Sequence, residues 1–370
     1  MKIIRIIYII IFALLITAPG VYILYADDAE FSENENRYLQ KMPEISAEKF
    51  LNKKLQDEFT EYISDQFPGR NTFMQMTTQI KKTAGYKDIG GVYLGSEGYY
   101  LEKITDSDID EKKLYNNVLT AEKFADNYGM RAFIMLVPSS GSVLKQYMPE
   151  GASCYDYSAH LDKVSQTGNV LDMYDVMADL AENEQAYYKT DHHWTSRGAY
   201  EASSFFKEAA GLNIKEYEYY EPKSVSDGFY GTLYSKVLDK AASPDTMELP
   251  YALPEVSVKI EGIKNTLTGI YDTGKLSLKD KYAVFFGGNY GKVTIENSKS
   301  TGKNLLVIKD SFANSFVPYL FEDYDTITMI DLRFFAGNVS EALEESGADD
   351  MLVLYEMSNF SHDMNFYKVK

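Results

Sequence analysis

The chain has 370 residues, of which 45% are hydrophobic and 25% are charged, as in ordinary globular proteins. Lys and Arg total 37 against 55 Asp and Glu, so the formal net charge is −18. A surface this acidic repels nucleic acid over most of its area, and we expect no nucleic-acid partner. Cys154 is the only cysteine, which excludes an intrachain disulfide. Its polar, loop-like surroundings argue against a catalytic thiol.

The N-terminus predicts a membrane anchor. Lys2 and Arg5 precede an apolar run from Ile6 to Ala26, and 21 residues is close to the ~20 that a helix needs to cross the hydrocarbon core. Acidic residues follow, so the positive-inside rule places residues 1–26 as a cytoplasmic stub and single-pass anchor in the cell membrane, with the body outside. Cleavage after Ala26 as a secretory signal is the alternative, and it would also export the body.

Residues 27–88 are predicted to form an extracytoplasmic tether followed by helices. Apolar residues at helical spacing indicate one helix from about Ser46 to the residues before Pro68, and a second from Thr72 to Thr83. The glycine-containing stretch from Gly90 to Leu101 is typical of a hairpin. Residues 111–128 again have helical spacing.

Residues 89–370 are predicted to form one α/β domain, a mostly parallel sheet flanked by helices. Strand and helix signals alternate along it, which implies right-handed crossovers. Thr195 is a plausible N-cap of one helix. Residues 213–280 have weak periodicity and are interpreted as a loop-rich or β-rich insertion. The predicted strands are 131–137, 282–286, 305–308, 326–330 and 351–355, and the predicted helices are 172–183, 196–210, 312–320 and 339–346.

The stretch Asp191-His192-His193-Trp194 is the leading candidate for chemistry, because it holds two of the four histidines beside a carboxylate. On an extended backbone, residues two apart point to the same side, so Asp191 can reach one nitrogen of His193 while His192 projects the other way. An imidazole held in this way keeps its second nitrogen free to take a proton from a nucleophile. His160 and His362 lack such a carboxylate and are expected at the surface.

Ser311 is the predicted nucleophile. It follows the predicted strand 305–308 and precedes a helix, and sites in α/β sheets collect beyond the carboxyl ends of strands. Backbone N–H groups at the helix start could receive an oxyanion, and Asp310 is a plausible cap. Asn289, after a Gly-Gly turn, is a candidate oxyanion donor. Arg333 either contacts substrate or pairs with Asp331.

At these residues the sequence resembles the DHHW family of exported bacterial proteins, which is similar to the SGNH-hydrolase-like domain of alginate O-acetylation proteins. The resemblance extends over roughly residues 35–360 and is weakest across 213–280. The stretches that carry it are Glu35–Pro43, Tyr62–Arg70, Val92–Tyr99, Asp191–Gly198 and Lys309–Phe312.

The resemblance implies an Asp191–His193–Ser311 triad and a serine O-acetyltransferase or acetylesterase acting on a cell-surface polysaccharide or exopolysaccharide. It implies an acyl donor, which a membrane-bound O-acyltransferase could supply, and no cofactor. His192 stands where the alginate proteins have a small or polar residue, so it leaves open which histidine is the base and is a further substrate-contact candidate.

Two other functions fit the residues. A non-catalytic module that binds polysaccharide or organises an export and modification complex would use the same anchor and fold. A metal-dependent phosphoesterase would use Asp191, His192 and His193 as ligands. Manganese phosphoesterases with an Asp-His-His stretch need further upstream Asp and His motifs, and the only earlier histidine here is His160. The divergence expected of adjacent histidine side chains also argues against shared metal ligation, so no metal is predicted.

Overall fold

The computed structural model describes residues 2–32, 37–264, 267–297 and 301–370. It divides into two compact units: residues 1–86 with 235–241, and residues 87–234 with 242–370. Glu35 and Asn36, the first residues of the stretch Glu35–Pro43, lie outside the described residues.

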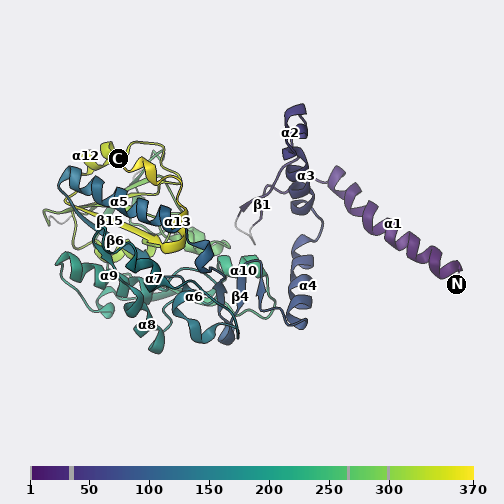
Figure 1. Ribbon diagram of the computed structural model, residues 1–370, viewed down its shortest axis with the longest axis horizontal. Coiled ribbons are helices and arrows are strands. Elements are labelled where there is room, and N and C mark those ends of the chain that lie inside the picture. Colours follow the sequence, from purple (N-terminus) through teal and green to yellow (C-terminus); the bar gives the residue numbers. More distant parts are fainter. Residues whose placement is uncertain (1, 33–36, 265–266, 298–300) are drawn as a thin grey trace. The chain divides into compact units, whose positions relative to one another are not determined.

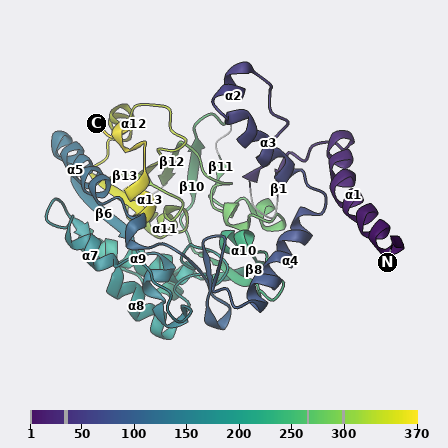
Figure 2. The same cartoon turned by 45° about the vertical axis from the view of Figure 1, so that its right-hand side comes forward.

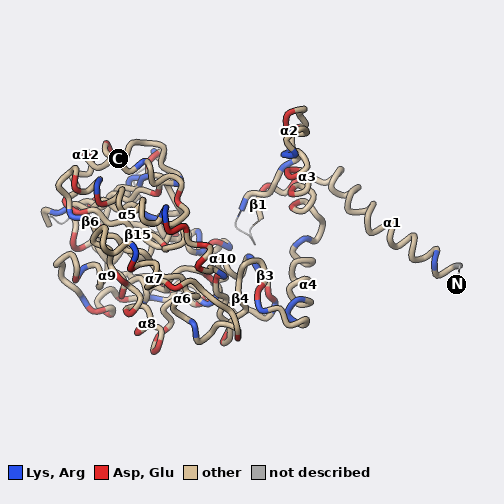
Figure 3. Tube along the Cα trace, viewed as in Figure 1, with Lys and Arg blue, Asp and Glu red and all other residues tan. Residues whose placement is uncertain are grey.

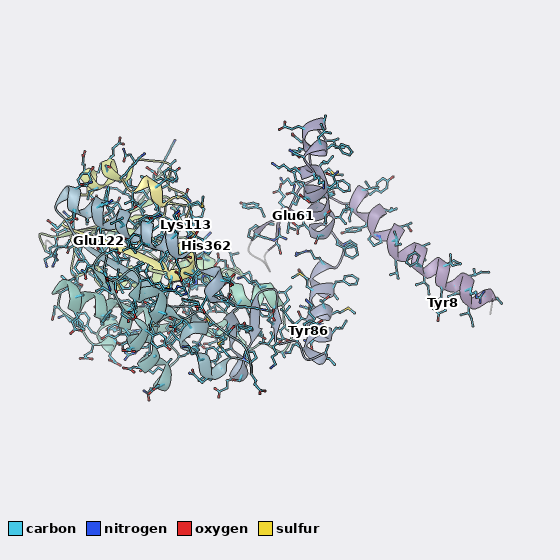
Figure 4. All side chains as sticks on the ribbon, viewed as in Figure 1. Tyr8, Glu61, Tyr86, Lys113, Glu122 and His362 are labelled. Carbon is cyan, nitrogen blue, oxygen red and sulfur yellow. The ribbon has the colours of Figure 1, made fainter. Side chains whose placement is uncertain are left out.

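The first unit holds the N-terminal helix α1 (Lys2–Tyr25), which is long and apolar enough to cross a membrane. Figure 3 shows α1 without charged residues apart from its first turns, and the labelled Tyr8 points away from its axis in Figure 4. The single helix predicted before Pro68 is wrong, because Lys53 adopts a left-handed backbone conformation (φ 66°) that divides it in two. The other elements are β1 (Phe31–Ser32), β2 (Arg37–Tyr38), α2 (Ala47–Leu51), α3 (Lys54–Asp65) and α4 (Arg70–Thr83).

Polar contacts hold the first unit together. The Asp65 carboxylate is buried between Arg37, which contacts both of its oxygens, and the backbone N–H of Gln40. The hydroxyl of Thr78 on α4 donates to the carbonyl of Val237 at 2.5 Å, so residues 235–241 pack with α4 although they are distant in sequence.

The second unit contains an eight-stranded sheet in the order β11-β10-β12-β14-β13-β15-β6-β7. The five strands from β14 to β7 are parallel, which confirms the predicted mostly parallel sheet. The strands are β6 (Arg131–Val137), β7 (Val170–Leu171), β10 (Val256–Ile260), β11 (Leu267–Thr268), β12 (Lys292–Asn297), β13 (Asn304–Lys309), β14 (Thr326–Ile330) and β15 (Asp350–Glu356).

Helices cover both faces of this sheet, as Figures 1 and 2 show for α5 on one side of β6 and α8 and α9 on the other. Side chains of the central strands alternate between two cores: Val307 packs with the first, and Leu306 and Ile308 pack with the second. The first core holds α8 (Tyr174–Asn183), α9 (Ser196–Ala210) and α11 (Ala313–Phe316). The second holds α5 (Glu111–Tyr128), α7 (Tyr157–Asp162), α12 (Val339–Ser346) and α13 (Met357–His362).

Residues 282–286 do not form the predicted strand; they begin with a 3₁₀ turn at Lys281–Val284. Strand β12 extends the sheet instead, pairing antiparallel with β14 on one side and β10 on the other. Strands β10 and β11 are therefore part of the main sheet. The rest of the weakly periodic region contains β8 (Lys223–Phe229), β9 (Asp245–Leu249) and α10 (Thr232–Val237).

The remaining elements are short. Strands β3 (Asp88–Ile89), β4 (Val92–Leu94) and β5 (Tyr100–Glu102) form a small antiparallel sheet, which confirms the predicted hairpin. Helix α6 (Ser140–Val143) follows β6, and a 3₁₀ turn at Val317–Leu320 continues α11 to the predicted end of that helix.

Candidate active site

Ser311, His193 and Asp191 lie in one hydrogen-bonded line. The Nε2 atom of His193 is 2.8 Å from Ser311 Oγ, and its Nδ1 atom is 2.5 Å from Asp191 Oδ1. The two hydrogen bonds require the tautomer with the proton on Nδ1, because Asp191 can only accept and Nε2 must be free to receive the serine proton. This is the geometry that nucleophile activation requires.

The Asp191 side chain is held by donors on all sides. Its Oδ1 accepts the backbone N–H of His193 at 2.9 Å, and its Oδ2 accepts the backbone N–H (2.7 Å) and hydroxyl (3.1 Å) of Thr232. Burial by itself raises the pKa of Asp191, but the neighbouring imidazoles and these hydrogen bonds lower it well below its ordinary value. The carboxylate therefore stays ionised and can stabilise an imidazolium at His193.

The expectation that His192 projects away from His193 is wrong. The two imidazole centroids are only 3.9 Å apart, because residues 191–193 lie in a bend between the bridged residues Tyr187 and Trp194 instead of an extended strand. The Nδ1 atom of His192 is 2.7 Å from Thr232 Oγ1 and 3.5 Å from Asp191 Oδ1. It is His193 that contacts the serine, so His193 is the better candidate base.

One consequence of this bend concerns metals. Asp191, His192 and His193 each offer a ligand atom, and the three atoms lie within 4.8 Å of one another. Sequence reasoning rejected such a cluster on the ground of divergence, and that ground is wrong. Both ring nitrogens of His193, however, already face Asp191 and Ser311. In this arrangement His193 takes part in hydrogen bonds and has no ring nitrogen left to bind a metal ion.

The turn that carries Ser311 is tied down by its neighbour Asp310. Asp310 Oδ1 accepts the N–H of Phe312 at 3.0 Å, as a cap would, and Oδ2 accepts the N–H of Glu356 at 2.9 Å and the amide of Asn359 at 3.1 Å. These bonds join the end of β13 to the end of β15. The Phe312 N–H is thereby occupied, whereas within the described residues the Ser311 N–H has no partner. The latter is the better oxyanion donor.

Aromatic rings enclose the His193 imidazole. Tyr282 stacks on it with centroids 3.9 Å apart and planes inclined by 8°, and Phe312 lies at 4.9 Å. Trp194 is fully buried and donates from Nε1 to Ser315 Oγ at 2.8 Å. These contacts leave the imidazole little freedom to rotate.

Asn289 contacts two residues that flank Ser311 in the sequence, Asn314 and Lys309. Its Oδ1 accepts the amide of Asn314, three residues beyond Ser311, at 3.0 Å and the amine of Lys309 at 3.4 Å. Phe286 (φ 60°) and the following glycine, Gly287, adopt left-handed backbone conformations. These turn the loop that carries Asn289 toward the end of β13. The Asn289 amide nitrogen has no partner in the described part of the chain, so it can donate to a ligand.

The other predicted residues fall outside this line of contacts. Arg333 grips both oxygens of Asp331, at 2.8 and 2.6 Å, and its contact with substrate stays a prediction. The prediction for His160 is wrong: the ring is buried, and it lies 2.9 Å from the Asp106 carboxylate. His362 is exposed, as predicted and as Figure 4 shows. Burial raises the pKa of Cys154 to about 11, which disfavours a reactive thiolate.

Sequence reasoning missed several contributors to the site. Thr232 lies in the weakly periodic region, and Tyr282 lies in a segment predicted to be a strand. Lys279, whose pKa burial lowers to about 8 although nearby Asp191 opposes the shift, has its amine 4.5 Å from the ring centre of Tyr234. No spacing in the sequence connects these residues to Asp191.

Residues 149–330 match the family model described as DHHW protein. Among solved structures, a DHHW family protein from Eubacterium siraeum DSM 15702 has TM-score 0.66 and 22% identity, covering 76% of this chain and 95% of that one. Bacillus cereus PatB1 with a sulfonyl adduct has TM-score 0.62 and 19% identity, covering 75% and 98%.

A weaker structural match is the O-acetyltransferase domain of Pseudomonas putida AlgJ, with TM-score 0.47 and 14% identity over 74% of this chain and 93% of that one. No curated protein sequence matches the chain. The family match and the shared fold confirm both the predicted family resemblance and the predicted SGNH-like α/β fold.

Proposed function

We propose that this protein, whose residues 149–330 match the DHHW family model, is an extracytoplasmic serine O-acetyltransferase or acetylesterase that modifies a polysaccharide. The observation that carries the proposal is the unbroken line Asp191–His193–Ser311, with 2.5 Å and 2.8 Å between successive partners. A buried ionised carboxylate, an oriented imidazole and a half-buried hydroxyl at a strand end are the parts of an acyl-transfer catalyst.

In the first half-reaction, Ser311 Oγ attacks the carbonyl carbon of an acetyl ester while His193 Nε2 takes the hydroxyl proton. The tetrahedral oxyanion is stabilised by the Ser311 N–H, with the amide of Asn289 as a candidate second donor. The ester C–O bond then breaks, and His193 returns the proton to the departing alcohol. An acetyl ester on Ser311 is left behind.

In the second half-reaction, His193 removes a proton from the incoming hydroxyl, whose oxygen attacks the acetyl carbon. The proton then passes to Ser311 Oγ as the acyl bond breaks. A sugar hydroxyl as acceptor yields an acetylated polysaccharide, and water yields acetate. The same residues serve both acceptors, so access of the acceptor decides between transfer and hydrolysis.

The location proposed for this chemistry is the outer side of the cell membrane. Helix α1 supplies a candidate anchor, and Lys2 and Arg5 at its start favour a cytoplasmic N-terminus. The acetyl donor would then be delivered at the membrane, and a membrane-bound O-acyltransferase is a partner of suitable chemistry.

The test uses the full chain in detergent with p-nitrophenyl acetate as donor. Wild-type protein releases p-nitrophenol and acquires an acetyl group on the Ser311 peptide, seen by mass spectrometry after acid quench. Ser311→Ala loses both signals. Ser346→Ala is the matched control, because Ser346 lies at the end of α12, where its hydroxyl donates to the Leu343 carbonyl and accepts the N–H of Ala348. Equal background rates in wild type and Ser311→Ala would overturn the proposal.

A non-catalytic polysaccharide-binding role gives a different pattern in the same experiment. Sugar oligomers would bind wild type and Ser311→Ala equally, and neither protein would form an acetyl-enzyme.

A further inference from the structure

Tyr282 touches both members of the proposed nucleophile–base pair. Its ring is stacked on the His193 imidazole at 3.9 Å, and its hydroxyl is 3.3 Å from the carbonyl oxygen of Ser311. The side chain is 7% exposed. Among the described residues, no other side chain both packs a ring against His193 and forms a hydrogen bond with Ser311.

The hydroxyl of Tyr282 belongs to a chain of hydrogen bonds with one consistent direction. Trp194 Nε1 can only donate, so it donates to Ser315 Oγ at 2.8 Å. Ser315 then donates to the Tyr282 oxygen at 2.9 Å, and Tyr282 donates to the Ser311 carbonyl, which can only accept. Burial raises the pKa of Tyr282, so its hydroxyl keeps the proton that this last bond needs.

These hydrogen bonds form a closed network. They run from Trp194, the residue after the base, to the main chain of Ser311, and the hydrogen bond between His193 and Ser311 connects the two ends. A closed network of short contacts fixes the distance between the Ser311 hydroxyl and the His193 imidazole more firmly than one hydrogen bond does, because each contact opposes a shift of the others.

The main chain around Tyr282 is itself anchored. The N–H of Asp272 donates to the carbonyl of Val284 at 2.8 Å, and the N–H of Phe286 donates to the carbonyl of Ile270 at 2.7 Å. The 3₁₀ turn that carries Tyr282 is therefore fastened to residues 270–272 and can act as a fixed reference for the ring.

We propose that Tyr282 is a positioning residue that sets the distance and angle between Ser311 Oγ and His193 Nε2. The inference rests on the proposed acyl-transfer function and adds to it two separable roles. The hydroxyl places the Ser311 main chain, and the ring face orients the imidazole that stacks on it.

The first test separates the hydroxyl from the ring. Tyr282→Phe keeps the stacking surface and removes the bond to Ser311, and Ser315→Ala breaks the same chain from its other side. Each variant should lower kcat for p-nitrophenyl acetate about tenfold with KM nearly unchanged, since small misplacements of reacting groups reduce rate more than binding. The double variant should be no worse than about the larger single effect, because both changes break one chain.

The second test removes the ring. Tyr282→Leu keeps an apolar cover over His193 but loses the flat aromatic face against which the imidazole stacks. The imidazole then has more freedom to rotate, so kcat should fall by about a hundredfold with KM nearly unchanged. Tyr282→Phe keeps the aromatic face, so its loss in kcat should stay at about tenfold.

Tyr324→Phe and Tyr324→Leu are the matched controls. Tyr324 is also buried, and its hydroxyl contacts Asp350 at 3.4 Å, at the opposite ends of the strands from Ser311. Both control variants should lower the thermal midpoint without changing kcat. If Ser311→Ala abolishes turnover while the Tyr282 variants match wild type, the positioning role fails and the acyl-transfer function stands. If Ser311→Ala has no effect, the function itself fails.

Discussion

Gly231 packs so closely against Asp191 that a β carbon built on it would overlap the aspartate side chain, including Oδ2. The same carboxylate oxygen accepts the N–H and the hydroxyl of Thr232, the next residue. Gly231 and Thr232 thus fix the position of the Asp191 side chain in the proposed triad.

Gly231→Ala should displace Asp191 and weaken its hold on His193. We expect kcat for acetyl ester hydrolysis to fall by about ten- to a hundredfold, with a loss of about 1–3 kcal/mol in the free energy of unfolding from overpacking. Gly168→Ala is the control, because its β carbon would meet the flexible end of the Glu122 side chain elsewhere in the second unit. Steady-state kinetics and urea denaturation measure both; unchanged activity in Gly231→Ala contradicts the prediction.

Asp191→Asn should lower kcat/KM by roughly 10³–10⁴-fold, the size of effect known when an amide replaces the orienting carboxylate of a serine triad. The amide keeps the volume but lacks the charge, and it can stabilise the wrong imidazole tautomer. Thr232→Val should have a smaller effect, about threefold to tenfold, since it loses the hydroxyl contacts with Asp191 (3.1 Å) and His192 (2.7 Å) but keeps the 2.7 Å backbone bond to Asp191. Thr232→Ser should restore the rate.

The raised pKa of the buried Glu356 carboxyl should make the stability of the protein depend on pH. The carboxyl is buried at the end of β15, and burial raises its pKa to about 8, with Glu102 adding to the shift. The folded state therefore keeps a proton that the unfolded chain releases above about pH 4.3. Stability should fall as pH rises between about 4.3 and 8, by an amount on the order of a few kcal/mol, because the folded state binds more protons there.

Glu356→Gln should remove most of this slope, since an amide mimics the protonated carboxyl and does not ionise. Urea denaturation at pH 5 and pH 8 measures it, with exposed Glu344→Gln as the control. Equal slopes in wild type and Glu356→Gln would contradict the prediction.

The anchor can be tested by fractionation. The full chain should remain with membranes after an alkaline carbonate wash, and a chain that starts at Asp27 should be soluble. The physical reason is that α1 exposes a continuous apolar surface, long enough to cross the hydrocarbon core of a membrane. An intact mass of 42.0 kDa for the membrane-bound protein distinguishes the anchor from a cleaved signal. Recovery of the full chain in the soluble fraction would contradict it.

Chelation provides a test of the metal alternative. Asp191, His192 and His193 lie close enough to share an ion, but both ring nitrogens of His193 already contact Asp191 and Ser311 in the proposed triad. We expect acetyl ester hydrolysis to be unchanged by EDTA, and added Zn²⁺ to inhibit it by competing for His193. Loss of activity in EDTA with recovery on Mn²⁺ or Zn²⁺ would favour a metal-dependent enzyme.

The sequence by itself determined the parts of this protein that depend on local pattern. Apolar runs bounded by prolines, glycines and charges predicted β6, β13, β14, β15, α5, α9 and α12, since each buries a continuous face. The spacing of Asp191 and His193 also predicted their contact, which involves only neighbours along the chain.

Tertiary structure decided everything that depends on distant segments. The segment 282–286 has the composition of a strand, but it packs as a turn because Tyr282 stacks on His193 and strand β12 occupies the place in the sheet. His192 turns toward His193 because Thr232 bonds to both Asp191 and His192 from another segment. Long-range hydrogen bonds and packing override local preference at these positions, and no residue spacing encodes them.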